Sequence, residues 1–115
     1  MKIYLISKDS FLAQEFLLAL ASNSYNIEVH EDGLIALEDM RHSIPASIFV
    51  DNDCDGLNPL ILLKLISRDS RFENSKIFFL SKDEIDNKPD FIKEYGIFKV
   101  LNKPISNEKF LDLVL

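Results

Sequence analysis

Residues that can accept or bind a phosphoryl group follow several apolar, strand-like runs of the 115-residue sequence. Asp51 follows the apolar run IFV, Ser81 follows the run IFFL, and Lys103 lies just after the run VL. A carboxylate can act as a nucleophile and form an acyl phosphate, whereas a hydroxyl group and an ammonium group can bind phosphoryl oxygens. If these runs are neighbouring strands of one sheet, Asp51, Ser81 and Lys103 meet around one pocket.

The spacing of apolar residues predicts five strands that alternate with five helices. The expected strands are Lys2–Ser7, Asn26–His30, Ala46–Asp51, Lys76–Ser81 and Ile97–Leu101. The expected helices are Ser10–Ser22, Gly33–His42, Pro59–Ser67, Pro89–Tyr95 and a last helix that begins at Ser106. This alternation is typical of an α/β protein whose parallel sheet is covered by helices on both faces.

The predicted strands differ in how far they are expected to be buried. Ile3–Ile6, Ile48–Val50 and Ile77–Leu80 are uninterrupted apolar runs, which suits strands covered on both faces. Polar residues alternate along Asn26–His30, and Lys99 interrupts the last strand, as is common at sheet edges. We therefore expect a doubly wound sheet of order 2-1-3-4-5, with a ligand site at the carboxyl ends of the first and third strands.

Composition and charge exclude several classes of protein. Thirteen Lys and Arg residues against 19 Asp and Glu give a net charge of −6, so direct binding of nucleic acid is not expected. The single Cys54 cannot form an internal disulfide, and His30 and His42 lack the spacing of metal ligands. No apolar run approaches the roughly 20 residues that cross a bilayer. We expect a cytoplasmic protein without membrane contact.

The pattern resembles the receiver domain of bacterial response regulators of the chemotaxis type. The resemblance rests on the segments KIYLIS, PASIFVD, KIFFLS and GIFKVLNKP. It implies one flavodoxin-like domain over residues 1–115, with Asp51 as phosphoacceptor and Ser81 and Lys103 as phosphate contacts. It also implies a histidine kinase or phosphotransfer protein and an output domain as partners, and no enzymatic activity. The short last helix is compatible with a module excised from a longer protein that continues into the output domain.

The sequence departs from the family at the acidic residues that hold Mg²⁺. Receivers end their first strand with two acidic residues, which bind the ion together with the phosphorylated aspartate and a backbone carbonyl, here that of Asp53. Ser7 and Lys8 stand where the acidic pair is expected. Because Mg²⁺ requires oxygen ligands, we expect weak or no binding, with Lys8 paired to Asp51 in place of the ion. The alternative is a weaker site rebuilt with the carboxylates of Asp9 and Asp53.

A second departure concerns the conformational switch. Val100 stands where receivers usually carry an aromatic side chain that rotates when the aspartate is phosphorylated. A short β-branched side chain has no comparable pair of inward and outward positions. The usual aromatic relay is therefore not expected.

Apolar side chains on two predicted helices suggest either core packing or contact with partners. Leu60, Ile61 and Leu63 belong to a helix that is apolar over most of its circumference. They predict either a deeply covered helix or a surface for a homodimer or another protein. Phe11 and Phe16, on the first helix, are expected to pack in the core.

Two main functional hypotheses remain open. A degenerate receiver, which binds partners without the conventional phosphorylation cycle, is favoured by Ser7, Lys8 and Val100. A working phosphoacceptor is favoured by Asp51 with its hydroxyl and ammonium neighbours.

A small phosphatase of the haloacid-dehalogenase type would also use an Asp-x-Asp motif, but too few strands follow Asp51. The run 51–56 copies the start of an EF-hand loop, yet Leu62 occupies its twelfth position, where a glutamate is required.

Overall fold

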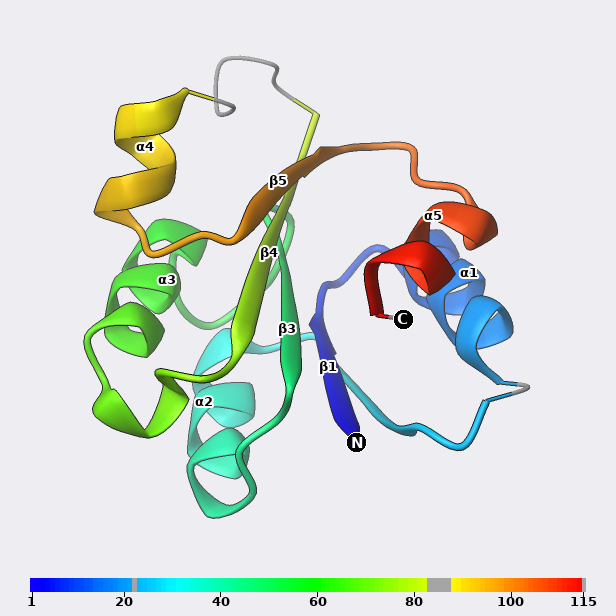
Figure 1. The fold of residues 1–115 in the computed structure, drawn as a ribbon, viewed down its shortest axis with the longest axis horizontal. Coiled ribbons are helices and arrows are strands. Elements are labelled where there is room, and N and C mark those ends of the chain that lie inside the picture. Colours follow the sequence, from blue (N-terminus) through cyan, green and yellow to red (C-terminus); the bar gives the residue numbers. More distant parts are fainter. Residues whose placement is uncertain (22, 83–87, 115) are drawn as a thin grey trace.

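A five-stranded parallel sheet of order β2-β1-β3-β4-β5 forms the centre of the protein (Figure 1). The computed structural model describes residues 1–21, 23–82 and 88–114. The strands are β1 (Lys2–Ile6), β2 (Asn26–His30), β3 (Ser47–Asp51), β4 (Lys76–Ser81) and β5 (Lys99–Asn102). The helices are α1 (Ser10–Leu20), α2 (Gly33–His42), α3 (Pro59–Ser67), the 3₁₀ turn η1 (Ser70–Phe72), α4 (Pro89–Glu94) and α5 (Asn107–Val114). The predicted fold class and strand order are confirmed.

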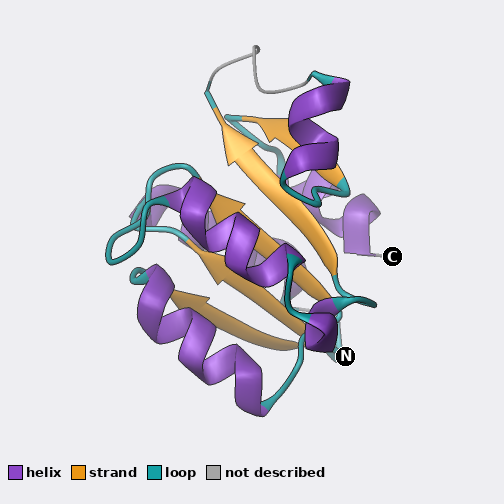
Figure 2. Cartoon of the chain, turned by 90° about the vertical axis from the view of Figure 1, so that its left-hand side faces the viewer, coloured by secondary structure: helices purple, strands orange, loops and turns teal. Residues whose placement is uncertain are grey.

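Helices cover both faces of the sheet, and each face has its own apolar core. Figures 1 and 2 show α2, α3 and α4 along one face, with α1 and α5 on the opposite face. Strand β3 is buried along its whole length, whereas β2 at the edge is only half-buried. The uninterrupted apolar runs thus form the central strands, because both of their faces are covered.

The last strand begins later than the sequence predicts. The backbone N–H of Ile97 donates to the carbonyl of Ile92 at the end of α4, at 3.0 Å, so Ile97 completes a turn and does not pair in the sheet. Regular pairing with β4 begins at Lys99 and continues to Asn102. Ser22, the predicted end of the first helix, and Leu115, the last residue of the printed sequence, lie outside the described residues.

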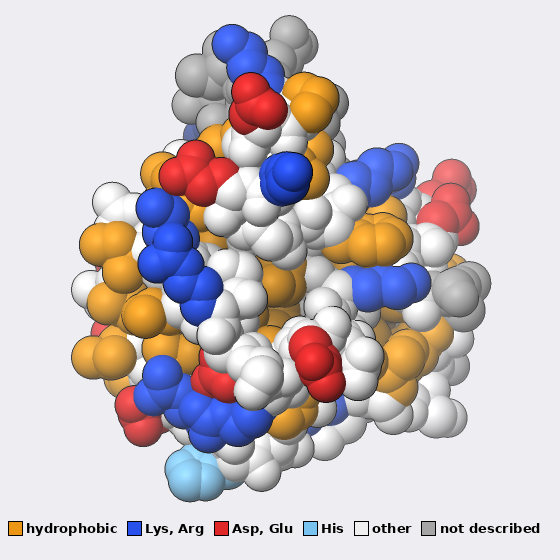
Figure 3. Space-filling view, turned by 60° about the vertical axis from the view of Figure 1, so that its left-hand side comes forward, with side chains coloured by type: hydrophobic (Ala, Val, Ile, Leu, Met, Phe, Trp, Pro, Cys, Tyr) orange, Lys and Arg blue, Asp and Glu red, His pale blue; other side chains and the backbone are white. Residues whose placement is uncertain are grey.

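The prediction that Leu63 lies on a partner surface is wrong. Leu63 is fully buried beside Leu62 and Ile66, because these residues form the stripe of α3 that packs on the sheet. Leu60 is half-buried against the same core, while Ile61 is 52% exposed. Figure 3 shows apolar side chains that reach the surface on this side of the molecule.

The expectation that Phe11 packs in the core is also wrong. Phe11 is 68% exposed, whereas Phe16 is fully buried. The inward stripe of α1 consists of Leu12, Phe16 and Leu20, which are spaced four residues apart, so Phe11 falls outside it. In the described part of the chain, no helix has the length and apolar character needed to cross a membrane.

Candidate functional site

Asp51, the last residue of β3, lies at the carboxyl edge of the sheet and is fully buried. Its Oδ2 accepts a hydrogen bond from the Ser7 hydroxyl at 2.7 Å, and its Oδ1 accepts one from the Asp53 backbone N–H at 3.1 Å. The Lys103 ammonium lies 3.1 Å from Oδ1 and 2.9 Å from Oδ2. Each carboxylate oxygen therefore accepts at least two hydrogen bonds, so the buried charge is well compensated.

Lys103 joins two carboxylates at this edge of the sheet. Its side chain is 8% exposed, and its Nζ lies 3.1 Å from Oδ2 of Asp9 as well as against Asp51. Burial lowers the pKa of Lys103, but the two carboxylates together outweigh that effect and raise it above its ordinary value. Asp9 is the N-cap of α1, and the Leu12 N–H and then the Lys103 ammonium lower the pKa of Asp9.

The predicted pairing of Lys8 with Asp51 is wrong. The Nζ of Lys8 lies 3.6 Å from Asp53 and 3.4 Å from Asp55, and its side chain is about half exposed. The backbone N–H of Lys8 donates to the Asp53 carbonyl at 2.9 Å, which holds Lys8 beside the loop that carries both carboxylates. Asp55 first, and then Asp53, raise the pKa of Lys8. Lys103, and not Lys8, supplies the cation at Asp51.

Ser81 and Val100 are held near this edge by the pairing of the last strands. Asp51 is the register partner of Leu80, which precedes Ser81, and the Ser81 carbonyl accepts the Lys103 N–H at 2.9 Å. Ser81 is fully buried at the end of β4. Val100 is 6% exposed and packs in the core on the side of α3 and α4. The strand ends thus bring a carboxylate, a hydroxyl residue and an ammonium to one edge.

The solved structures that resemble this chain include response-regulator domains. The chemotaxis response regulator CheY4 of Vibrio cholerae aligns over 98% of this chain and 94% of its own, with 20% identity and a TM-score of 0.87. The response regulatory domain of mrkE from Klebsiella pneumoniae aligns over 99% and 92%, with 20% identity and a TM-score of 0.82. A CheY-like receiver domain from Methylobacillus flagellatus aligns over 99% and 95%, with 18% identity and a TM-score of 0.82.

The chain has the receiver-domain fold. No protein-family model and no curated protein sequence matches it. The similarity therefore lies in the three-dimensional arrangement of strands and helices, which is the arrangement that the sequence pattern predicts.

The donor set of this receiver-type pocket does not suit Mg²⁺. The ion requires near-octahedral oxygen coordination, usually with carboxylates. Here the Asp51 oxygens already accept several hydrogen bonds, and the Lys103 ammonium lies between Asp51 and Asp9. The Asp53 carbonyl, which the resemblance implies as a ligand, accepts the backbone N–H of Lys8. A divalent ion would therefore meet a fixed cation, and the carboxylates that it needs are paired with Lys103 and Lys8.

Two cavities open beside the carboxylate edge. One has a volume of about 310 Å³, and its lining consists of Asp51, Asn52, Asp53, Lys82 and Lys103. The other has a volume of about 430 Å³, and its lining consists of Asp9, Phe11, Leu12, Glu15, Lys82, Lys103, Pro104 and Ile105. Both are lined by Lys82, which sequence reasoning missed. Lys82 directly follows Ser81 in the sequence, and this position could have identified it. The residue after the end of a strand lies at the same edge of the sheet as the strand end.

Proposed function

We propose that this chain is a signalling module of the receiver type that acts through protein contacts, without Mg²⁺-dependent phosphorylation. The observation that carries this proposal is the position of Lys103, whose ammonium lies between Asp51 and Asp9 at 2.9–3.1 Å. This built-in cation neutralises one of the two carboxylates at neutral pH. Ser7 and Lys8 stand where receivers carry the acidic pair that holds Mg²⁺, so the pocket lacks the exchangeable site that such an ion occupies.

The chemistry of phosphoryl transfer supports this proposal. Metal ions accelerate the transfer by neutralising the phosphoryl oxygens and by holding the attacking and leaving groups in line. A single ammonium supplies charge but only a loose orientation. In this pocket Lys103 is also bound to the nucleophile itself. Attack by Asp51 would require this ion pair to open, so slow or absent transfer is expected.

The second candidate function is a working phosphoacceptor. The meeting of Asp51, Ser81 and Lys103 at the ends of β3, β4 and β5 favours it, because these residue types can accept and bind a phosphoryl group. In that case a histidine kinase or a phosphotransfer protein donates to Asp51. For both candidates we propose an output domain or a separate protein as the partner, and a cytoplasmic location.

Nuclear magnetic resonance can separate the two candidates. Amide spectra of the ¹⁵N-labelled chain are recorded during addition of Mg²⁺ and then of beryllofluoride, which mimics an aspartyl phosphate. We expect no saturable shifts at Asp51, Ser81 or Lys103. Saturable shifts there in the wild type that vanish in Asp51→Asn would establish the phosphoacceptor and refute our proposal.

A gain-of-function variant provides the matched test. In the double variant Ser7→Asp with Lys8→Asp, two carboxylates replace the hydroxyl that donates to Asp51 and the ammonium that lies against Asp53 and Asp55. We expect this variant to bind Mg²⁺ in the millimolar range, because it supplies the missing oxygen ligands. A wild-type chain that binds Mg²⁺ as tightly as the variant would contradict the proposal.

We also propose that the chain is not an enzyme. Too few strands follow Asp51 for a phosphatase of the haloacid-dehalogenase type. Turnover of p-nitrophenyl phosphate by the wild type, lost in Asp51→Asn, would contradict this.

A further inference from the structure

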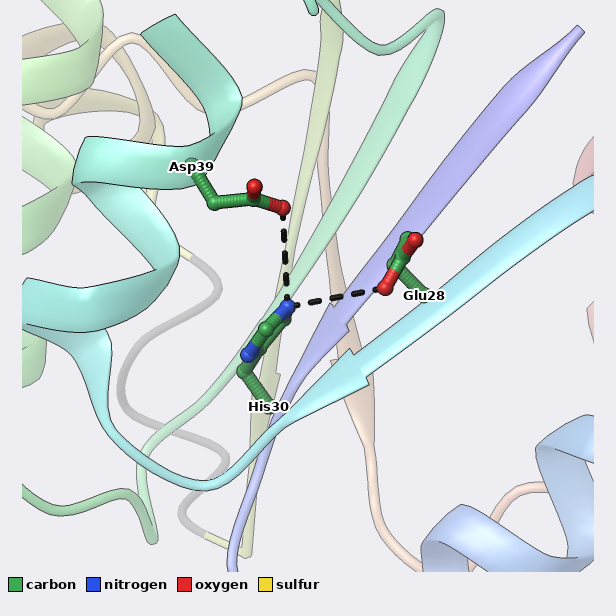
Figure 4. Close-up of side chains that lie close together, drawn as sticks. All are labelled: Glu28, His30 and Asp39. Atoms are coloured by element: carbon green, nitrogen blue, oxygen red, sulfur yellow. Dashed lines mark ion pairs between the residues drawn. The ribbon is translucent and has the colours of Figure 1, made fainter. Parts of the chain in front are cut away.

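A second group of chemically active side chains lies on the edge strand β2 and the neighbouring helix α2. Glu28 and His30 are two residues apart on β2, so their side chains share one face of the sheet. Asp39 comes from α2, which packs on that face (Figure 4). The His30 Nε2 lies 3.6 Å from Oε2 of Glu28 and 3.7 Å from Oδ2 of Asp39. One ligand atom from each residue falls within 4.8 Å of the other two.

The imidazole of His30 is fixed in position but lacks a hydrogen-bond partner at Nε2. Its ring stacks on the fully buried ring of Tyr4, with centroids 5.4 Å apart and planes at 11°. Nε2 itself is shielded from solvent and makes no hydrogen bond within the described part of the chain. A shielded polar atom without a partner is costly. Two carboxylates lie just beyond hydrogen-bond distance of Nε2, at 3.6 and 3.7 Å, and a ligand between the three groups would supply the missing partner.

The distances from the His30 nitrogen to the two carboxylates suit a small divalent cation. Bond lengths to Zn²⁺ of about 2.1 Å place two ligand atoms of a tetrahedral site about 3.4 Å apart. The distances from His30 to Glu28 and Asp39 are 3.6 and 3.7 Å. A neutral imidazole with two carboxylates also carries the charge that Zn²⁺ neutralises. Mg²⁺ and Ca²⁺ are less suited, because they bind through oxygen ligands.

We propose that Glu28, His30 and Asp39 form a Zn²⁺ site, with water in the remaining coordination position. The three ligands come from a strand and a helix, which are more rigid than loops. The side chains are between 26% and 47% exposed, so an ion can enter from solvent without unfolding of the core. Bound Zn²⁺ would connect the edge strand β2 to α2 and stabilise that edge by mass action.

Zinc titration of the whole chain tests the site. Competition with a chromophoric zinc chelator should give one equivalent bound, with a dissociation constant of about 10 µM or tighter. Asp39→Asn should weaken binding at least about tenfold, and His30→Gln about a hundredfold. Because the Asp39 side chain is about half exposed, Asp39→Asn is expected to fold and is a test by itself if His30→Gln does not.

Two matched controls exclude other binding sites. His42 is exposed at the end of α2, and Cys54 lies in the loop that follows β3. His42→Gln and Cys54→Ser should each retain the wild-type zinc affinity. Loss of binding in either control, with retention in Asp39→Asn, would overturn the proposal, as would the absence of binding in the wild type.

Cobalt supplies a direct view of the ligands. Co²⁺ in a tetrahedral site with one nitrogen and several oxygen ligands gives much stronger visible absorption bands than octahedral Co²⁺. We expect these bands in the wild type and in His42→Gln, and their loss in Asp39→Asn. Only the weak bands of octahedral Co²⁺ in the wild type would contradict a tetrahedral site on Glu28, His30 and Asp39.

Discussion

The buried pocket at Asp51 and the exposed cluster at His30 each gather carboxylates around one nitrogen base, but the two compensate charge differently. At the carboxyl edge of the sheet, Asp51 and Asp9 share the ammonium of Lys103, whose side chain is 8% exposed. On the edge strand, Glu28 and Asp39 flank the imidazole of His30, which carries a charge only when it is protonated.

The difference between the two places follows from burial. Asp51 is fully buried, so it needs a permanent counter-charge and a complete set of hydrogen bonds within the fold. The carboxylates beside His30 are 41% and 47% exposed, so water can solvate them until an ion or a proton arrives. A buried acidic cluster is thus complete by itself, whereas an exposed one is able to accept a ligand.

Removal of the buried cation should have the largest effect. Lys103→Met leaves Asp51 buried without its counter-charge, and the free energy of unfolding at pH 7 should fall by about 3–5 kcal/mol. Because the folded-state pKa of Lys103 is raised above its ordinary value, the stability that its charge contributes is complete at pH 7 and is lost as the pH rises through that pKa. The difference between the variant and the wild type should therefore stay constant near neutral pH and shrink above about pH 10.4. Urea unfolding at several pH values measures it, with the exposed Lys109→Met as control.

A difference that stays constant above that pH would mean that Lys103 stabilises the fold through packing and not through charge.

The thiol of Cys54 reports the negative potential that remains in the loop after β3. Burial, and then the charges of Asp51, Asp55 and Asp53, raise the pKa of Cys54 to about 11. A pKa about two units above normal leaves roughly a hundredfold less thiolate at pH 8, so reaction with iodoacetamide should be about a hundredfold slower than that of a free thiol. The rate should rise about tenfold per pH unit until the pKa is reached. Asp55→Asn should accelerate it, and a rate that levels off near pH 9 would contradict the raised pKa.

Ser7 tests the hydrogen bonds that complete the buried pocket. Its hydroxyl donates to Asp51 at 2.7 Å and accepts the Asp9 N–H at 3.0 Å. Ser7→Ala removes both bonds and leaves buried polar groups unsatisfied, so the free energy of unfolding should fall by about 1–3 kcal/mol. Chemical denaturation measures this loss. Ser10→Ala, at an exposed position of α1, provides the comparison and should change stability by less than about 0.5 kcal/mol. Equal effects would mean that Asp51 does not depend on the hydroxyl.

The smallest effect is expected at the exposed cluster without metal. Glu28→Gln removes one of two like charges beside His30. The free energy of unfolding should change by less than about 0.5 kcal/mol in a buffer that contains a chelator. With Zn²⁺ added, the wild type should gain thermal stability and the variant should gain much less. Melting curves with and without Zn²⁺ measure both quantities. A large loss in chelator would show that Glu28 acts as a structural partner and would weaken the contrast with Asp51.

Much of the fold could be predicted, because the pattern of apolar and polar residues indicates which strands are buried. Uninterrupted apolar runs marked the central strands, and polar residues in Asn26–His30 marked an edge. Two predictions were wrong at the level of single residues. Phe11 was placed on the buried face of α1, and β5 was expected to begin too early. Spacing alone leaves such positions ambiguous, because neighbouring helical positions differ by only about 100°.

The sequence indicated which residues lie at the candidate site, but it did not show which of them form ion pairs with one another. The strand ends identified Asp51, Ser81 and Lys103, since parallel strands bring their carboxyl ends to one edge. The group around His30 was missed, because Glu28 and Asp39 belong to two different elements and no short motif joins them.

By itself, the sequence determined the order of the sheet and which residues gather at its edge, because both follow from the pattern of apolar and polar positions. Only the tertiary structure decided which lysine neutralises Asp51. A backbone hydrogen bond holds Lys8 beside Asp53 and Asp55, while the pairing of β5 with β4 brings Lys103 inward. A flexible side chain can reach several acceptors, and the fold around it selects one.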